Sequence, residues 1–413
     1  MSAVDTRSAG TGIDDLLSGD GLSCVFQPFV DVDTGSVPAF EALMRGPEGS
    51  RWHSPLALLA AARETGRLAD LERASLRASL ADAARLSAGR PITLFVNLEP
   101  STVTRYPDMV LDVLAGRADH VQVVVEITER ALAADPAGIL AAAERLRAGG
   151  HAIALDDVGA LPESLAFIPL LRPEVVKLDL GLLRTIKDPA TVAVAGAVRA
   201  YAEQTGAEVV AEGIETPEDL TRALVLGATL GQGWLWGRGE RVLVPSTSQP
   251  QRFAARPIGA ALRTSPYELI DTGQRIREAP KHLLVPLSRT LELMAAEAGV
   301  PPILLAAFEH ARFFRPATVR RFTEFAERLP FVAAFGVDMP AAPAPGVRGG
   351  ALSADDPLAG EWTVVVLGAH TSAALIARDL GDSGPDADRR FEFVVTYDRA
   401  LVTSAAHAMV GRL

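Results

Sequence analysis

The stretch that decides the fold lies in the middle of the first half of the chain and reads "VQVVVEIT" (121–128), "GILAAAERLRAGG" (138–150) and "AIALDD" (152–157). An apolar run is followed by an alanine- and leucine-rich segment with helical spacing, and then by a second apolar run. This order predicts two buried strands joined by a helix, which is typical of α/β proteins with a parallel sheet.

The same alternation extends in both directions from this stretch. Further strand candidates are "CVFQPFV" (24–30), "VPAFEALMR" (37–45), "ITLFVNL" (92–98), "VVKLDL" (175–180), "EVVAEGI" (208–214) and "ATLGQGW" (228–234). Eight strands with intervening helices predict a TIM-like (β/α)8 barrel. The first two strands are separated only by "DVDTGS" (31–36), which is too short for a helical crossover, so we expect them to be antiparallel.

The pattern changes after the eighth strand, and the sequence predicts four segments. Residues 1–14 form a polar tail, 15–245 the barrel, 246–261 a polar, proline-bearing linker, and 262–413 a smaller α/β domain. Within this last part, "LSRTLELMAAEAG" (287–299) is helical, "WTVVVLG" (362–368) and "RFEFVVTYD" (390–398) are strand-like, and "MPAAPAPGVRGGALSADDP" (339–357) is expected to be a mobile loop.

Composition restricts the class of partner and the compartment. The net charge of −11 argues against a nucleic-acid polymer or an anionic membrane as the main partner. The only cysteine, Cys24, lies between apolar neighbours and is expected to be a buried, unreactive thiol. The N-terminus is polar, and no run reaches the length of a membrane span, so we expect a cytoplasmic protein.

Polar residues gather at the carboxyl ends of the predicted strands, where barrels of this kind carry their chemistry. They are Glu41, Asn97, Glu126, Asp156, Asp157, Lys177, Glu212, Glu215 and Gln232. Each one alone has a structural reading: Asn97 can bond a loop, for example, and Lys177 can pair with Asp179. Six carboxylates at one mouth, however, repel one another by a few kcal/mol for each close pair (about 4 kcal/mol at intermediate dielectric), and one lysine does not neutralise six acids.

Divalent cations can neutralise such a cluster, and an all-oxygen ligand set suits Mg2+ or Mn2+ rather than zinc. The adjacent Asp156 and Asp157 suit two metals, with one carboxylate shared between them. Such a pair activates a water molecule and holds the oxygens of a phosphodiester during in-line displacement. Charge and residue type therefore predict phosphodiester hydrolysis.

The motifs also resemble a known family. "EALMR" (41–45) is similar to the signature of the EAL domain, a phosphodiesterase family that linearises cyclic di-GMP. Seven further motifs of the family occur with it in the family's order over residues 15–245: "FQPFV", "FVNLEP", "EITE", "DDVG", "KLD", "AEGIE" and "GQGWLWGR". A single tripeptide would carry no weight, but eight ordered motifs are specific.

The resemblance implies a role for each matching residue. Glu41, Asn97, Glu126 and Asp156 would hold one metal, and Asp156 with Asp157 the second. Glu212 would be a ligand or the general base beside the attacking water, and Lys177 would orient that water or neutralise the phosphate. Gln27, Leu43, Arg45 and Arg238 would contact the nucleotide, Glu215 and Gln232 would support the site, and Glu129 would brace the loop after Asp157.

That loop departs from the family pattern. Active members read close to DDFGTGYSSL, whereas this chain has "DDVGALPESL" (156–165). Leucine and proline replace a glycine-containing turn, which restricts the backbone. Two readings follow: a phosphodiesterase, or a cyclic di-GMP receptor that no longer turns its ligand over. A scaffold without either function is disfavoured, because unneutralised acids would destabilise the barrel.

The C-terminal part resembles the DICT domain, a sensory module, through "LSRTLE" (287–292), "AAFEHARFFR" (306–315), "FTEFAERLPFVAAFG" (322–336), "DPLAGEWTVVVLG" (356–368) and "RRFEFVVTYD" (389–398). His310, Arg312, Phe313 and Phe314 suit a ligand pocket, but aromatics at this spacing are more typical of a core, and no site is assigned. The resemblance to the EAL domain also implies a homodimer, in which the loop after Asp157 has a role, and the signal at the C-terminal domain is unknown.

Overall fold

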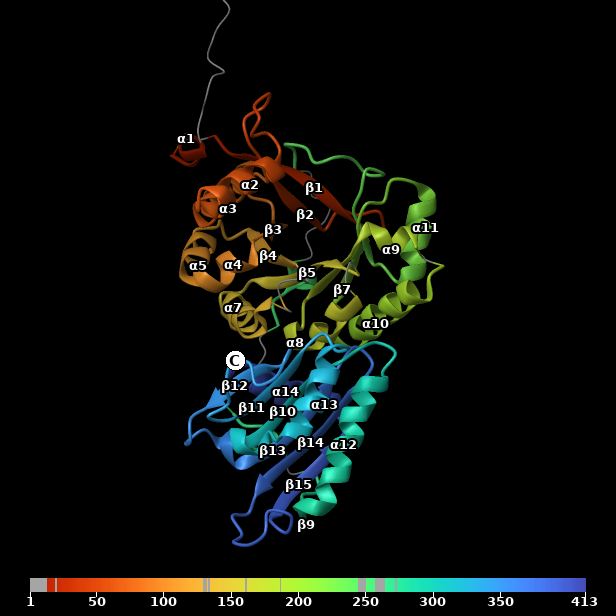
Figure 1. Ribbon diagram of the computed structural model, residues 1–413. Coiled ribbons are helices and arrows are strands. Elements are labelled where there is room, and N and C mark those ends of the chain that lie inside the picture. Colours follow the sequence, from red (N-terminus) through yellow and green to blue (C-terminus); the bar gives the residue numbers. More distant parts are fainter. Residues whose placement is uncertain are drawn as a thin grey trace, which may run out of the picture.

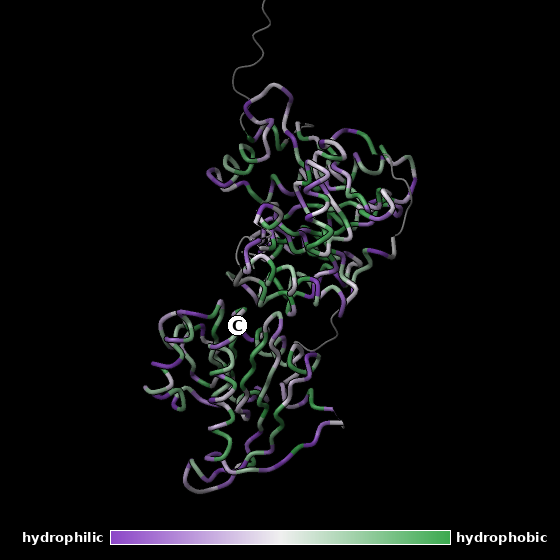
Figure 2. The backbone as a smooth tube through the Cα atoms, turned by 90° about the vertical axis from the view of Figure 1, so that its right-hand side faces the viewer, coloured by the Kyte–Doolittle hydropathy of each residue, from purple (hydrophilic) through white to green (hydrophobic). Residues whose placement is uncertain are grey.

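A computed structural model describes residues 13–413 except 19–20, 129–131, 133, 160–161, 186, 244–249, 257–263 and 272. It contains two parts, a barrel and a smaller domain beneath it, which are shown one above the other in Figure 1. Hydrophobic segments run through the middle of both parts, and hydrophilic segments lie mostly outside (Figure 2).

The first part is a closed eight-stranded barrel in which the strands follow one another in chain order. The strands are β1 (Ser23–Asp31), β2 (Ala39–Arg45), β3 (Ile92–Asn97), β4 (Val121–Thr128), β5 (Ala152–Val158), β6 (Val175–Leu178), β7 (Glu208–Ala211) and β8 (Leu230–Gly231). β1 is antiparallel to both β2 and β8, and all other pairs are parallel. The predicted barrel with an antiparallel first strand is confirmed.

Helices surround the barrel (Figure 1): α1 (Ile13–Ser18), α2 (Pro55–Glu64), α3 (Leu68–Leu86), α4 (Pro100–Arg105), α5 (Pro107–Ala115), α7 (Pro136–Ala148), α8 (Ile168–Leu171), α9 (Leu180–Arg184), α10 (Pro189–Thr205) and α11 (Pro217–Leu226). Several begin with proline, whose fixed φ suits the first helical turn. Thr216 and Asp219 form a reciprocal capping box at the start of α11. β3 to β5 are almost wholly buried because helices cover the outside and side chains fill the inside.

The amino-terminal end of the barrel is closed from the linker side. Phe253, in the short helix η2 (Pro250–Phe253), is fully buried, and its ring centroid lies 5.4 Å from that of Phe95. Gln122 Nε2 donates a 2.8 Å bond to the Phe253 carbonyl, and Arg252 pairs with Asp31 at 2.6 Å and with Glu208 at 2.7 Å. Residues 250–256 of the expected linker are therefore held against the barrel.

The second part is a seven-stranded sheet of order β12-β11-β10-β13-β14-β15-β9. Its strands are β9 (Arg277–Pro280), β10 (Ile303–His310), β11 (Val332–Val337), β12 (Arg348–Leu352), β13 (Glu361–Leu367), β14 (Ser372–Asp379) and β15 (Arg390–Thr396), and its helices are α12 (Lys281–Glu297), α13 (Pro316–Ala326) and α14 (Arg399–Val410). The smaller α/β domain is confirmed. The expected loop at 339–357 is corrected, because it contains β12, which pairs in parallel with β11.

The period of two along β10 sends alternate side chains to two different cores. Leu304 and Ala306 pack with α12 and α13, whereas Leu305 and Ala307 belong to the core that α14 shares with the barrel. The sheet is therefore covered by α12 and α13 on one face, and by α14 with the barrel on the other.

The two parts meet through α8 and the turn before it. The rings of Phe167 and Phe331 lie 5.8 Å apart, edge to face, and His407 Nε2 of α14 lies 2.5 Å from the Leu170 carbonyl oxygen. Arg348 donates a 3.0 Å bond to the Ala134 carbonyl. Because one hydrophobic cluster runs through this contact, the two parts share a core.

Candidate metal centre

Lys177 of β6 lies at the centre of the acidic cluster. Its Nζ is 2.7 Å from Glu126 Oε1, 2.7 Å from Glu212 Oε1, 3.1 Å from Asp156 Oδ1 and 3.8 Å from Glu41 Oε2. The lysine is buried, with 1% of its surface exposed. Four strands thus direct acids at one cation, because the carboxyl ends of parallel strands meet at the same edge.

Glu41 is also held by two amides from other strands. Asn97 Nδ2 donates to Glu41 Oε1 at 2.6 Å, and Gln232 Nε2 donates to Glu41 Oε2 at 2.7 Å. Gln232 Nε2 also lies 3.5 Å from the side-chain oxygen of Gln27, which is paired with Glu41 across β1 and β2. Both oxygens of Glu41 are therefore fixed in direction.

Asp156, Asp157 and Glu212 form a second group, in which one carboxylate oxygen from each lies within 4.8 Å of the others. Adjacent strand residues normally point to opposite faces. Asp157 instead has φ of +59°, and the β5–β6 register shifts between Leu155 and Val158. The Asp157 N–H donates to Asp156 Oδ1 at 2.9 Å. This local turn lets neighbouring carboxylates serve one site.

Burial and like charges shift the pKa values at this site. Burial, and then Glu41, raise the pKa of Glu126 well above its usual range despite Lys177. Burial raises the pKa of Glu212 to about 8, opposed by Lys177 and assisted by Asp156. Burial also opposes ionisation of Glu41, but Lys177 and the two amides outweigh it and lower the pKa of that carboxyl. The cluster carries more negative charge than one lysine neutralises.

The residues fit a divalent cation. Glu126 Oε1 lies 2.7 Å from Lys177 Nζ, whereas the buried Oε2 has no hydrogen-bond partner among the described residues. Buried polar atoms are normally satisfied, so such an orphan calls for a ligand. The donors are all oxygens, which suits Mg2+ or Mn2+.

Other predicted residues are more exposed than this cluster. Leu43 and Arg45 end β2 and are half-buried, and the Arg45 guanidinium donates to the preceding carbonyl at 2.8 Å. Arg238 stacks 4.0 Å above the ring of Trp234, which is 56% exposed. Sequence reasoning overlooked Trp234, although an aromatic two residues after Gln232 was a usable signal. Glu215 is exposed and is not among the side chains that surround Lys177.

The loop after Asp157 is described only in part. Val158 is buried, and Gly159 has φ of +105°, with Leu182 Cδ1 2.4 Å from where a Cβ would stand. Only glycine fits there. Ala160, Leu161 and the predicted bracing residue Glu129 lie outside the described residues.

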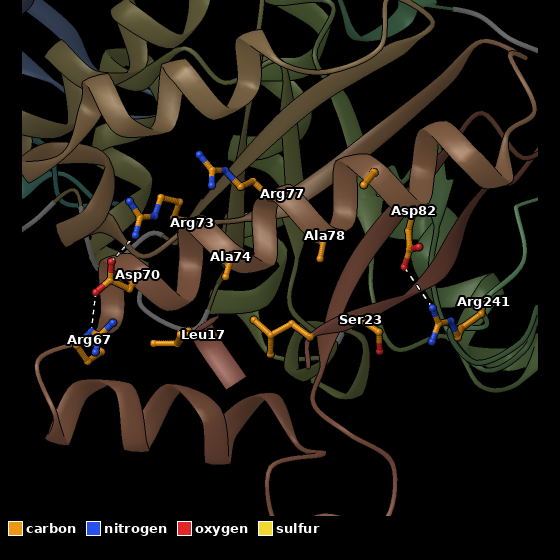
Figure 3. A pocket seen from close by; sticks show the side chains of 12 residues that line it. Leu17, Ser23, Arg67, Asp70, Arg73, Ala74, Arg77, Ala78, Asp82 and Arg241 are labelled. Carbon is orange, nitrogen blue, oxygen red and sulfur yellow. Dashed lines mark hydrogen bonds and ion pairs between the residues drawn. The ribbon is translucent and has the colours of Figure 1, made fainter. Parts of the chain in front are cut away.

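A cavity of about 790 Å3 lies away from this cluster, on the outer side of α3 (Figure 3). Arg67 and Arg73 both pair with Asp70 there, and Arg241 reaches Asp82 at 3.5 Å. The cavity contains none of the carboxylates around Lys177, so it does not belong to the candidate centre.

Residues 12–239, more than half of the chain, match the EAL-domain family. The chain belongs to the EAL-domain family. Residues 267–380 of the EAL-domain protein match the DICT family, described as a sensory domain in diguanylate cyclases and two-component systems. Among the described residues, no helix combines the length and apolarity needed to cross a membrane.

Named relatives match about half of the chain. Cyclic di-GMP phosphodiesterase RocR of Pseudomonas aeruginosa is 32% identical over 225 residues, covering 52% of this chain and 56% of the relative. Probable cyclic di-GMP phosphodiesterase PdeB of Escherichia coli is 29% identical over 221 residues, covering 52% and 42%. The chain therefore spans about half the length of these relatives. A solved structure, the PaMucR phosphodiesterase in complex with c-di-GMP, is 25% identical with a TM-score of 0.50, covering 55% of this chain and 95% of that one.

Proposed function

We propose that the protein hydrolyses cyclic di-GMP to linear pGpG with the help of divalent cations, Mg2+ or Mn2+, and that its C-terminal domain sets the rate. The observation that carries the proposal is the cluster of acids from separate strands around a single lysine. Two of these acids, Asp156 and Glu212, also group with Asp157, with one carboxylate oxygen of each within 4.8 Å of the others. The identity of the substrate is inferred from relatives named as cyclic di-GMP phosphodiesterases.

Cations held by Glu41, Asn97, Glu126, Asp156 and Asp157 would neutralise the phosphodiester and make the attacking water more acidic. The chain's own groups do the rest. Glu212 takes a proton from the water, since one of its carboxylate oxygens lies within 4.8 Å of oxygens of Asp156 and Asp157. The water oxygen bonds to phosphorus in line as the bond from phosphorus to the 3′ oxygen breaks. The 3′ oxygen takes a proton from solvent, which leaves a 5′-phosphate and a 3′-hydroxyl.

Charged and amide side chains position the substrate around this step. Lys177 neutralises negative charge that develops on the phosphate and on the leaving 3′ oxygen. Arg45 binds a phosphate oxygen, and Gln27, Leu43 and Arg238 contact the rest of the nucleotide. Gln232 keeps Glu41 in place through its 2.7 Å bond, and Glu215 supports the loop nearby.

The route by which the C-terminal domain acts is short. β5 carries Asp156 and Asp157, and the chain continues from it through η1 (Pro162–Phe167) into α8, which contacts α14. A change in the position of α14 therefore acts on the segment that leaves the metal loop. The division into a barrel at 15–245 and a sensory domain at 262–413, a homodimer, and a cytoplasmic location are further parts of this proposal.

The test is incubation of the purified protein with cyclic di-GMP and Mg2+ or Mn2+, with the products separated by chromatography. We expect linear pGpG to accumulate, and Glu41→Gln to abolish turnover while nucleotide binding persists. Glu64→Gln, on the exposed face of α2, is the matched control and retains full turnover. Unchanged turnover in Glu41→Gln contradicts the metal role of Glu41.

The altered loop at 158–164 favours a second function, that of a cyclic di-GMP receptor. Saturable binding of intact cyclic di-GMP by calorimetry, without product in either metal, would support the receptor over the enzyme. Sedimentation that shows only monomer in a fully active sample would contradict the homodimer.

A further inference from the structure

The C-terminal domain contains a cavity of about 520 Å3 between α12 and α13. It lies at the carboxyl end of β10, where Phe308 and Glu309 line it. The barrel touches the opposite end of the sheet, because Phe331 precedes β11, which is parallel to β10. A cavity of this volume is in the range of small-molecule sites.

The floor of the cavity is apolar and well packed. Phe308, Phe313 and Trp362 line it. The Phe308 ring lies 5.1 Å from Phe314 and 5.5 Å from Phe322 of α13. The Trp362 ring lies 5.8 Å from Phe391. Aromatic rings fixed in this way offer a preformed surface for a flat apolar group.

The acids of the cavity wall already have cationic partners. Asp386 pairs with Lys281 at 2.6 Å and with Arg315 at 3.0 Å. Glu292, which is 2% exposed, pairs with Arg321 at 2.5 Å. These acids therefore leave little negative charge to attract a cationic ligand.

The positive charge that is left over comes from Arg289. Arg289 lines the cavity from α12, is exposed, and has no ion-pair partner among the described residues. Glu309, the remaining acid of the wall, is bound by Arg389. Glu309 also has φ of +61° at a register shift in β10, a strained geometry that a non-glycine residue keeps only when its surroundings impose it.

We propose that this cavity binds a small organic anion, in which a carboxylate, sulfonate or phosphate is attached to an aromatic body. The rings of the floor receive the apolar body, and Arg289 at the rim receives the anionic group. A purely polar anion makes no use of the aromatic floor, and a cation meets the excess positive charge. The site lies at the end of the sheet away from the barrel and does not require the barrel to hydrolyse anything.

The test uses the full chain and two dyes that differ in one charged group. The first dye is 8-anilino-1-naphthalenesulfonate, and the second is the neutral N-phenyl-1-naphthylamine, which has the same rings without the sulfonate. Fluorescence titrations measure the affinity and the number of sites. Thr318→Trp fills the cavity, and Arg289→Glu reverses the charge at its rim. Thr290→Trp and Arg320→Glu are matched controls, at exposed positions of α12 and α13 that do not line the cavity.

We expect one saturable site for the sulfonate dye that is lost in Thr318→Trp. In Arg289→Glu its affinity falls about tenfold, while that of the neutral dye is unchanged, because reversing one rim charge acts only on the anion. Both controls bind as the natural chain does. Equal binding by Thr318→Trp, or no saturable binding, overturns the site. Unchanged sulfonate binding by Arg289→Glu overturns the anionic class of ligand.

Discussion

Replacing Lys177 by methionine tests whether the acid cluster depends on added positive charge. The substitution keeps an unbranched side chain only one atom shorter and removes the ammonium group that lies 2.7 to 3.8 Å from four carboxylates. Breaking a buried ion pair by removing one partner costs about 3–5 kcal/mol. At roughly 2–4 °C per kcal/mol for a domain of this size, the melting temperature falls by about 10 °C.

The loss depends on pH in a defined direction. Without Lys177, the carboxyl pKa values in the folded protein rise above their unfolded value of about 4.3, so the folded state binds more protons. The free energy of unfolding then falls as pH rises through the raised pKa values. The melting temperature of Lys177→Met is therefore reduced more at pH 8 than at pH 5.

Thermal unfolding in a chelator and in Mg2+ or Mn2+ measures the effect without any substrate. Divalent cations replace the missing charge, so they raise the melting temperature of Lys177→Met more than that of the natural chain. Lys187→Met, at an exposed position, is the control and responds as the natural chain does. If Lys177→Met melts like the natural chain in chelator at pH 8, or gains no more from metal, the reasoning is wrong.

Three further substitutions test other features. Burial raises the pKa of Glu72 to about 7, so the stability that its protonated form gives is lost as pH rises through 7. Glu72→Gln should therefore raise the free energy of unfolding by up to about 2–3 kcal/mol at pH 8 and by little at pH 4. Equal gains at both pH values in urea unfolding would contradict this. Gly159→Ala places a Cβ against Leu182 at positive φ. This should lower the free energy of unfolding by about 2 kcal/mol and weaken stabilisation by metal. An unchanged melting temperature in the presence of metal would contradict this prediction. Phe331→Ala removes a buried ring that packs against Phe167 between the two parts of the chain. It should lower the free energy of unfolding by about 3 kcal/mol and change the rate of turnover. A loss of stability at an unchanged rate would show that this contact does not regulate turnover.

Much of the barrel is predictable from the sequence because its strands are short, apolar and bounded by helical patterns. The short turn at 31–36 was enough to predict the antiparallel first strand, since no crossover fits into it. β12 was missed because "RGGAL" contains two glycines and lies in a proline-rich stretch, where local propensity opposes a strand and only pairing with β11 decides.

The candidate site was predictable as a set of residues but not as a geometry. Strand ends identify Glu41, Glu126, Asp156 and Glu212, because barrel topology brings such ends together. Nothing in the sequence indicates that Lys177 contacts all four, since that depends on side-chain distances across the barrel. Glu215 was expected at the same strand end as Glu212, but β7 ends at Ala211, and Glu215, four residues further on, is exposed.

The burial of Phe253 has a consequence for how this barrel is combined with other domains. A chain cut at residue 245 loses a ring from the interior of the barrel, where it packs beside Phe29 and Phe95. A chain cut after Arg256 keeps that ring and also keeps the Arg256 bond to the Thr205 carbonyl. A different sensory domain is therefore best joined after residue 256, so that the barrel keeps the segment 250–256 that fills its amino-terminal end.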